Sequence, residues 1–263
     1  MSSPTVAIGR VNWLGVWTLY VKEIQRFRKI ILQTVIAPSV SALLFLTVFS
    51  LALGGVLRTV GDIPYLQFLA PGLIMMALFQ NSFQNSMSSL IVAKVQGNIV
   101  DYLMPPLSAA ELTIAIAMGG VTRGIVVGCA VAVAMFPFAP LGVHHVGAII
   151  FYGVTGSLML SSIGVIAGIW AERFDQTAVI TNFVVTPMTF LSGTFYSIDR
   201  LPGIWHTLSK LNPFFYAIDG FRYGFIGVSD GSLVMGVIIL IGVDLALLLT
   251  CYLLFATGFR LKT

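Results

Sequence analysis

Long stretches of apolar residues with almost no charge are the feature of this sequence that most restricts its fold. The stretch 233–255 contains 23 residues and a single charged one, Asp244. A helix needs about 20 mostly apolar residues to cross a bilayer, and in lipid only helices and closed barrels satisfy every backbone polar group. Over the whole chain 9% of the residues are charged, whereas a soluble domain has about 25%. The sequence therefore predicts an all-α integral membrane protein and excludes a soluble domain, a disordered chain and a nucleic-acid binder.

Six stretches of the chain are predicted to cross the membrane as helices. They cover residues 34–54, 66–93, 118–137, 146–170, 177–191 and 233–255. The first is too long for the apolar region of a cleavable signal peptide, so we expect it to be retained. We predict a single membrane domain over residues 1–263. Outside the spans it has an amphipathic cytoplasmic segment, 1–33, and an extracytoplasmic re-entrant segment, 192–232.

Lysine and arginine are distributed unevenly between the two sides of these spans. With both termini in the cytoplasm, ten of the 14 lie in inner segments and four lie in outer segments. Cytoplasmic segments of membrane proteins carry the excess of Lys and Arg. The distribution therefore predicts an even number of spans with both termini in the cytoplasm.

The N-terminal stretch has the periodicity of a helix that lies in the plane of the membrane. Its aromatic and apolar residues recur at spacings of four, three, four and three: Trp13, Trp17, Tyr20, Ile24 and Phe27. Its polar face carries Thr18, Lys22, Gln25, Arg26 and Lys29. Trp and Tyr favour the headgroup region and a basic face favours anionic lipid. We predict an in-plane helix that ends near Lys29 and contacts membrane lipid; the alternative is a positive flank that only sets the topology.

The loop between the second and third predicted spans is short and rigid. Gly97 can end one helix, and Pro105 ends a short helical piece over 99–104. Ser108 and Glu111 match the S-x-x-E capping box that begins a helix. A stiff exposed element of this kind suits docking into a groove on a partner, whereas an ordinary connector is the alternative.

The segment after the fifth predicted span combines helix breakers with aromatic residues. Prolines and a Ser192-Gly193 pair interrupt it, yet Phe190, Phe195 and Phe215 keep it apolar. Irregular backbone lies at membrane depth only where protein or a cavity surrounds it. We expect short helices that dip into the outer leaflet.

These three features, in this order, resemble the membrane (permease) subunit of type-2 ABC exporters. The loop Asp101-Tyr102-Leu103-Met104-Pro105-Pro106-Leu107-Ser108 lies where that family has its coupling helix. The most specific match is residues 187–193 followed by Asn212-Pro213 and 219–222. The likeness covers essentially the whole chain.

The resemblance implies a fold and a set of partners. We expect six spans per subunit, a second copy alongside with a path between the two, and two soluble ABC ATPase subunits, in the bacterial inner membrane. The sequence has no G-x-x-x-x-G-K-[ST] loop to hold ATP phosphates, so ATP and Mg are expected on the ATPase and no cofactor on this chain. The expected substrate is a drug-like or lipid or lipo-oligosaccharide amphiphile, with a lipid-linked polysaccharide as the alternative.

Three groups of candidate functional residues follow from these expectations. The residues expected to dock on the ATPase are Ile99, Asp101, Tyr102, Leu103 and Pro105. The possible pathway residues are Asn81, Phe83, Gln84, Asn85, Ser88 and Asp244. The outer gate residues are Pro187, Phe190, Phe195, Phe215 and Arg222. Amides that face lipid are costly, so the polar half of the second span either lines a pathway or forms hydrogen bonds between helices.

Two further features of the spans leave alternatives open. Asp244 lies near the middle of the last span and is paired with Arg123, hydrated in a pathway, or neutral and hydrogen-bonded between helices. A stripe of small residues in the fourth span favours close helix packing, within the subunit or across a dimer. Its members are Gly153, Ser157, Ser161, Gly164 and Gly168.

A membrane-embedded enzyme and a channel are the competing functional classes. An enzyme needs a nucleophile, a base or a metal cluster, and adjacent His144 and His145 without acidic or thiolate neighbours indicate a polar outer turn. Cys129 and Cys251 are expected to be small apolar packing residues. A channel needs a filter or charged rings, which Asp244 alone does not supply. The sequence therefore predicts no catalytic or metal-binding residue in this chain.

Overall fold

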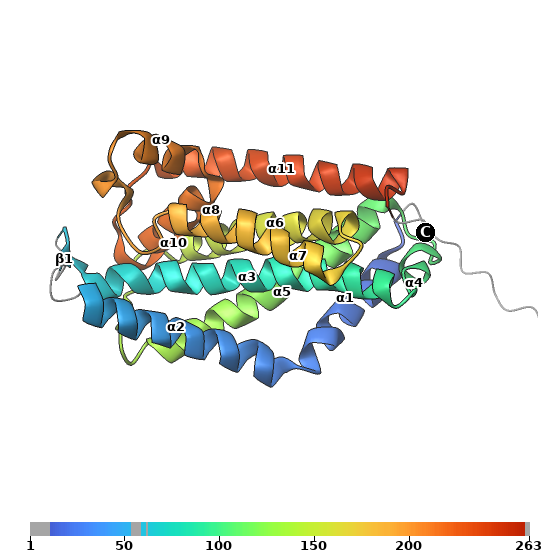
Figure 1. The fold of residues 1–263 in the computed structure, drawn as a ribbon, viewed down its shortest axis with the longest axis horizontal. Helices are drawn as coiled ribbons and strands as arrows, with labels where there is room; N and C mark the ends of the chain where they lie inside the picture. The colour runs from blue at the N-terminus through green and yellow to red at the C-terminus, as the bar shows by residue number, and fades with distance from the viewer. Residues whose placement is uncertain (1–10, 54–58, 62, 261–263) are drawn as a thin grey trace, which may run out of the picture.

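Five long helices lying side by side form the body of the computed structural model, which describes residues 11–53, 59–61 and 63–260 (Figure 1). They are α2 (Ile31–Leu53), α3 (Tyr65–Val95), α5 (Ala109–Met135), α6 (Val146–Trp170) and α11 (Leu233–Thr257). Each is long and apolar enough to cross a membrane, which confirms the predicted all-α membrane class. They correspond to the first four predicted spans and the last; the predicted end of the first span, Gly54, lies outside the described residues.

The fifth predicted span, 177–191, differs from the prediction because it is not a single α-helix. It consists of α7 (Phe174–Ile180), a π-helical turn (Thr181–Val185) and α8 (Thr186–Leu191). Pro187 in the first turn of α8 has no backbone N–H and its ring crowds the preceding turn. A widened turn directly before a proline relieves that crowding, which explains the π-helical geometry.

Helix α3 is the central element of the bundle. In its apolar 18-residue stretch, 83% of the residues are buried inside the chain, whereas the corresponding shares are 11% for α2 and 17% for α11. The small residues of α6 pack against it. A Cβ atom at Gly164 would overlap the carbonyl oxygen of Phe83 on α3, and Ser161 donates a 2.8 Å hydrogen bond to the Ala117 carbonyl on α5. This part of the predicted stripe therefore packs within the subunit.

The two ends of the bundle carry different elements (Figure 1). One end, which we call the α4 end, carries α1 (Trp13–Arg28), α4 (Val100–Leu103) and the last turn of α11. The other, the β1 end, carries the antiparallel pair β1 (Thr59–Val60) and β2 (Ile63–Pro64) and the helix α9 (Gly203–Leu211). From there α10 (Pro213–Ile226) returns along α6 and α3.

Helix boundaries near α4 follow the local signals in the sequence. Gly97 has a φ of +73°, which lets the chain turn after α3. The predicted capping box is confirmed: the Ser108 side chain accepts from the Glu111 N–H, and the Glu111 carboxylate accepts from the Ser108 N–H at 2.6 Å. The same carboxylate accepts from the Asn12 N–H at 2.6 Å. The start of α5 is therefore bonded to the start of α1.

Candidate functional site

The short helix α4 presents two different faces. Ile99 and Tyr102 are each 5% exposed and pack in a small apolar cluster with Leu19 of α1 and Leu112 of α5. Asp101, Leu103 and Pro105 lie on the surface. Of the five residues predicted to dock on an ATPase, these three are accessible to a partner. The prediction for Ile99 and Tyr102 needs correction, because their side chains hold α4 against the bundle instead of facing outward.

A fully buried carboxylate, Glu23 on α1, lies directly behind α4. Its Oε1 accepts hydrogen bonds from the Ser89 hydroxyl at 2.6 Å and the Tyr102 hydroxyl at 3.2 Å. Its Oε2 forms an ion pair with the Arg26 guanidinium at 3.0 Å. Burying a carboxylate is strongly unfavourable unless it is paired and hydrogen-bonded. These partners satisfy it, and through them Glu23 connects α1, α3 and α4.

The hydroxyl of Tyr102 remains a hydrogen-bond donor over the physiological range. Burial, together with the negative charge of Glu23, raises the pKa of Tyr102 to about 12. The phenol is therefore protonated at neutral pH and donates a hydrogen bond to the Glu23 carboxylate.

Arg26 extends this network along α3. Its guanidinium donates to the Asn85 carbonyl at 2.6 Å and to the Ser88 hydroxyl at 3.0 Å. Asn85 and Ser88 were among the predicted pathway residues, and in the structure they form hydrogen bonds between helices. That was the other reading of the polar half of this span.

Helix α1 buries a stripe of residues that differs from the aromatic face predicted for lipid contact. Trp13 and Trp17 of the expected apolar face are 74% and 62% exposed, and the buried side consists of Leu19, Glu23 and Phe27. Glu23 was not among the candidate residues predicted from the sequence. Its position four residues from both Leu19 and Phe27 was the signal that could have identified it.

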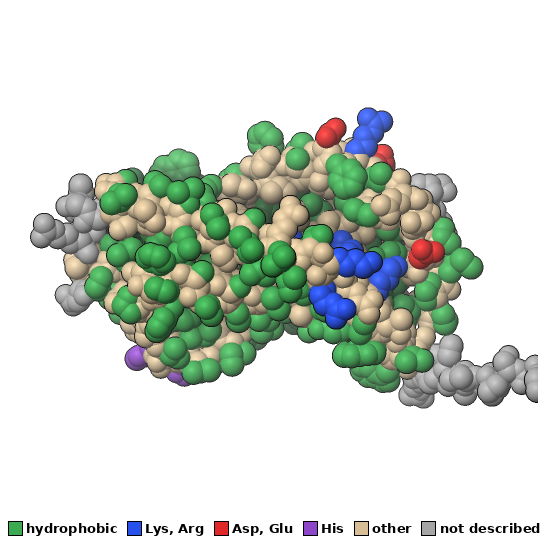
Figure 2. Space-filling view, turned by 90° about the horizontal axis from the view of Figure 1, so that it is seen from below, with side chains coloured by type: hydrophobic (Ala, Val, Ile, Leu, Met, Phe, Trp, Pro, Cys, Tyr) green, Lys and Arg blue, Asp and Glu red, His purple; other side chains and the backbone are tan. Residues whose placement is uncertain are grey.

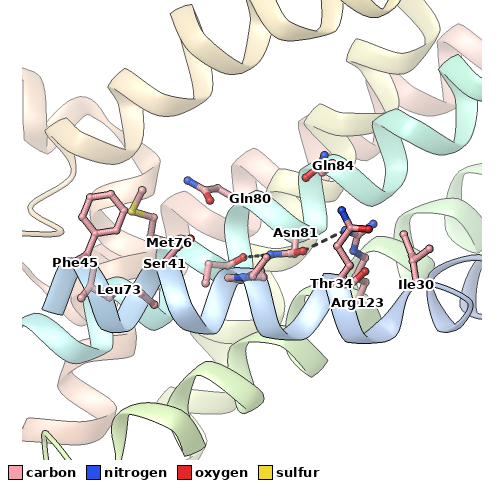
Figure 3. Close-up of a pocket in the computed structure, with 15 residues that line it drawn as sticks. Ile30, Thr34, Ser41, Phe45, Leu73, Met76, Gln80, Asn81, Gln84 and Arg123 are labelled. Atoms are coloured by element: carbon pink, nitrogen blue, oxygen red, sulfur yellow. Dashed lines mark hydrogen bonds between the residues drawn. The ribbon is translucent and has the colours of Figure 1, made fainter. Parts of the chain in front are cut away.

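A cavity of about 370 Å³ lies between α2 and α3, with one side chain from α5 (Figure 3). At one end Thr34 and Arg123 lie together, and at the other lie Phe45, Leu73 and Met76. Gln80, Asn81 and Gln84 of α3 line the middle. Two predicted pathway residues, Asn81 and Gln84, therefore do line a cavity.

The other predicted pathway residues do not line this cavity. Phe83 is 2% exposed and packs in the apolar core. Asp244 on α11 is 5% exposed, and its Oδ1 has no hydrogen-bond partner among the described residues. No ion pair within 4.0 Å joins it to Arg123 in that part of the chain. Of the three alternatives for Asp244, pairing with Arg123 is therefore not the one that the structure contains, because Arg123 turns toward Asn81 and the α2–α3 cavity.

The predicted outer gate residues differ in how far they are buried. Phe195 and Phe215 are buried, at 7% and 1% exposure, whereas Pro187 and Phe190 are exposed. Arg222 is 2% exposed; it donates to the Phe68 carbonyl at 3.3 Å and to the Gly193 carbonyl at 2.7 Å. Its guanidinium also stacks on the Phe68 ring, 3.9 Å from the centroid.

The hydrogen bonds of this segment explain why it folds without long helices. Asp219 accepts from the Asp230 and Gly231 N–H groups at 2.8 and 3.0 Å. Asn212 caps α10 and donates to the Met188 carbonyl at 2.7 Å. Side chains thus satisfy backbone groups that the broken helices leave free.

Comparison with known proteins identifies the family to which this architecture belongs. The sequence profile described as "ABC-2 type transporter" matches residues 15–226. The chain belongs to the ABC-2 type transporter family. It is 36% identical over 251 residues to the inner membrane transport permease YadH of Escherichia coli (strain K12), covering 95% of this chain and 98% of YadH.

More distant relatives also align over most of the chain. Nodulation protein J of Rhizobium leguminosarum bv. viciae is 24% identical over 232 residues, covering 86% of this chain and 87% of that protein. Nodulation protein J of Rhizobium meliloti (strain 1021) is 22% identical over 216 residues, covering 80% of each. As an ABC-2 permease, the chain is a multi-pass protein of the bacterial inner membrane that works with an ABC ATPase and is not itself the ATPase.

The adjacent histidines singled out from the sequence make local contacts at the start of α6, and the two cysteines differ in exposure. His145 accepts a hydrogen bond from the Ala148 N–H at 3.1 Å at the start of α6. His144 stacks edge-on with Tyr223 of α10. Cys251 is buried, whereas Cys129 is exposed on the outside of the chain.

Proposed function

We propose that this chain is the membrane subunit of an ATP-driven exporter that contains two copies of it and two soluble ABC ATPase subunits. Membership of the ABC-2 family and the relation to an inner membrane transport permease support this assignment. ATP and Mg bind on the ATPase subunits. The cargo is an amphiphile, of the drug-like, lipid or lipo-oligosaccharide class.

In this proposal each subunit crosses the membrane six times, with both termini and the α4 end in the cytoplasm. The distribution of Lys and Arg supports this orientation. The helical run 174–191 is the fifth pass, and its 18 residues extend about 27 Å at about 1.5 Å per residue. That length is close to the roughly 30 Å of the hydrocarbon core. Helix α1 then lies at the inner surface, where exposed Trp13 and Trp17 contact lipid.

The geometry of α4 is the observation that carries the assignment of the ATPase-docking element. Asp101 and Leu103 of α4, and Pro105 two residues after it, lie on the surface at the α4 end, while Tyr102 is hydrogen-bonded to Glu23. A force applied to the exposed face is therefore passed to α1 and α3 through the Glu23 network. Docking of the ATPase against Asp101 and Leu103 couples hydrolysis to movement of the spans.

A second copy completes the substrate path in this proposal. Gln80 and Gln84 lie one turn apart on α3 and are exposed in the single chain. Primary amides are costly in lipid, so the α2–α3 side faces water or a second copy. The buried Phe195 and Phe215 and the Arg222 bonds form the outer closure of the path.

Co-purification tests the docking assignment. The ATPase encoded with this permease is expected to co-purify in a one-to-one ratio. Asp101→Ala combined with Leu103→Ala should reduce its recovery and lower transport per ATP hydrolysed. Tyr102 is unsuitable for this test, because its loss disturbs the buried network.

The matched control changes the same residue types at the opposite end of the bundle. Asp199 and Leu208 are exposed there, and replacing both by Ala should leave ATPase recovery unchanged. Equal recovery for the α4 variant and the control, with normal coupled transport in both, would contradict docking at α4. A chain that transports as a monomer without nucleotide would contradict the whole proposal.

A further inference from the structure

The α2–α3 cavity has a polar end and an apolar end. Leu73 and Gln84, both on α3, line opposite halves and lie about 16 Å apart along the helix at about 1.5 Å per residue. Phe45 and Met76 continue the more apolar end, which also contains Ser41, and Thr34 and Arg123 lie at the more polar end, next to Ile30 (Figure 3). This distribution matches a molecule with one polar group and an apolar chain.

Arg123 is the charged group of the polar end. It is 8% exposed and belongs to α5, a helix long and apolar enough to cross the membrane. An arginine has five N–H donors and keeps its charge in proteins. In the described part of the chain, Arg123 makes one side-chain hydrogen bond, to the Asn81 amide oxygen at 3.3 Å, and its Nε has no partner.

The surroundings of Arg123 contain no compensating negative charge at contact distance. Within residues 11–53, 59–61 and 63–260, no carboxylate oxygen lies within 4.0 Å of its guanidinium. The Arg26 cation acts on it repulsively, and the carboxylate of Glu23 is already engaged by Arg26, Ser89 and Tyr102. A buried cation without a counter-ion is strongly unfavourable, so this end of the cavity favours an anion.

A second unpartnered donor lies at the same end. Thr34 on α2 is 5% exposed, and its hydroxyl has no hydrogen-bond partner among the described residues. Thr34 on α2 and Arg123 on α5 therefore place a hydroxyl and a guanidinium at the same end of the cavity. Side-chain hydroxyls and guanidinium groups are the usual donors to phosphate and carboxylate oxygens.

Other basic side chains are close to this end of the cavity. The last turn of α1 carries Arg26 and Arg28, and Lys29 follows. In the space-filling view, Lys and Arg side chains gather on this face toward the α4 end, among hydrophobic and other uncharged groups, and Asp or Glu side chains are visible farther toward that end (Figure 2). An anionic head group that approaches from the inner surface meets positive charge before it reaches Arg123.

We propose that the α2–α3 cavity binds an anionic amphiphile, with its phosphate or carboxylate group at Arg123 and Thr34 and its apolar chain along Phe45, Leu73 and Met76. This inference rests on the proposed export function and narrows its substrate class to amphiphiles with a negative head group. The same chemistry is present in a transported amphiphile and in a resident anionic lipid.

Equilibrium binding of radiolabelled dodecyl phosphate to the full chain, purified with its ATPase in phosphatidylcholine nanodiscs, tests the site. Dodecyltrimethylammonium, with the same chain and opposite charge, should not compete. Arg123→Gln should weaken dodecyl phosphate binding by about tenfold or more, the size expected for lost hydrogen bonds to a charged group. The matched control is Arg173→Gln, which removes an exposed arginine outside the cavity and should bind normally.

Two further variants keep the test decisive if Arg123→Gln folds poorly. Thr34→Val removes the hydroxyl at nearly constant volume and should weaken binding by several-fold, whereas Arg123→Lys keeps the charge and should retain part of it. Unchanged affinity in Thr34→Val and Arg123→Gln, or equal competition by the cationic amphiphile, would overturn the proposal. Displacement of dodecyl phosphate by inorganic phosphate at equal concentration would also overturn it, because the site would then take a free anion.

Adding ATP distinguishes the two sources of the anionic group. Release of bound dodecyl phosphate on hydrolysis supports a transported cargo, and unchanged occupancy supports a resident lipid; both agree with the site. Binding is measured on the permease itself, so its loss with an intact, coupled ATPase complex refutes only this inference. If the permease binds dodecyl phosphate normally but no ATPase co-purifies with it, the proposed function is refuted and the binding site is not.

Discussion

The Tyr102 hydroxyl donates a hydrogen bond to the Glu23 carboxylate. Removing this hydroxyl should destabilise the protein more than removing a tyrosine hydroxyl whose hydrogen-bond partner is neutral. Tyr102→Phe keeps the buried ring and deletes the contacts to Glu23 at 3.2 Å and to Ser89 at 3.1 Å. A hydrogen bond to a charged group contributes about 1.5–3 kcal/mol. For globular chains of 150–250 residues, each kcal/mol shifts the Tm by about 2–4 °C. The variant should therefore melt several degrees lower.

Tyr20→Phe is the matched control for this prediction. Tyr20 is also near α5, and its hydroxyl bonds to the neutral Thr122 hydroxyl at 2.9 Å. A neutral hydrogen bond contributes about 0.5–1.5 kcal/mol, so this variant should melt closer to the unaltered protein. A double-mutant cycle between Tyr102→Phe and Glu23→Gln should show a coupling of about 0.5–3 kcal/mol, as for contacting residues in one network.

The pH dependence of melting gives an independent check. Because the pKa of Tyr102 is raised to about 12 in the folded chain from 10.0, its contribution is fully present below pH 10 and is lost as the pH rises toward 12. The difference in Tm between the unaltered protein and Tyr102→Phe should be constant from pH 7 to 9 and should shrink above pH 10. Equal melting of Tyr20→Phe and Tyr102→Phe, additive losses in the cycle, and no narrowing at high pH would refute the role assigned to the network.

Three further predictions test other parts of the structure. Gly164→Ala should force α6 away from Phe83 and lower the free energy of unfolding by about 1–3 kcal/mol, whereas Gly242→Ala, with open space around it, should not destabilise; equal Tm values would contradict the packing of α6 on α3. Arg222→Lys should lower the folded yield, measured by gel filtration, because one ammonium cannot reproduce the planar fork that bonds the Phe68 and Gly193 carbonyls; exposed Arg200→Lys is the control. Asp244→Asn and Arg123→Gln should change the folded yield additively, since the two residues are not paired; a higher yield in the double variant than in either single variant would instead show that they are paired.

The ends of the long helices could be predicted where the sequence contains local signals. The apolar stretch of α6 begins after His145, which caps it, and the start of α5 follows from the Ser108 and Glu111 capping box. The break in the fifth span was harder to predict, because hydropathy does not depend on the backbone hydrogen bond that is missing at Pro187. The helix there changes type without any change in apolar character.

The side-chain partners could not be predicted to the same degree. Depth along a helix follows from residue number, and by depth alone Arg123 was within reach of Asp244. The rotation of each helix about its own axis is set by packing against neighbours, and that rotation turned Arg123 toward Asn81. The same limit applies to α1, where two neighbouring stripes fit the periodicity and the buried one contains Glu23.

Arg26 and Arg123 both lie near the polar half of α3, but they differ in how many of their hydrogen-bond donors have partners. That difference distinguishes a structural arginine from one that faces a ligand. In the sequence, Arg26 precedes the first predicted span and Arg123 lies within the third. In the structure Arg26 bonds to the carboxylate of Glu23, to Asn85 and to Ser88, so its charge is neutralised inside the chain and fixes α1 on α3. Arg123 bonds only to an amide oxygen within the described residues, so its charge is left to be neutralised by something that enters the cavity. Glu23 supplies the counter-charge of Arg26, and a second carboxylate could have done the same for Arg123. The cavity beside Arg123 explains why none is needed, because in our proposal the anionic ligand supplies that charge.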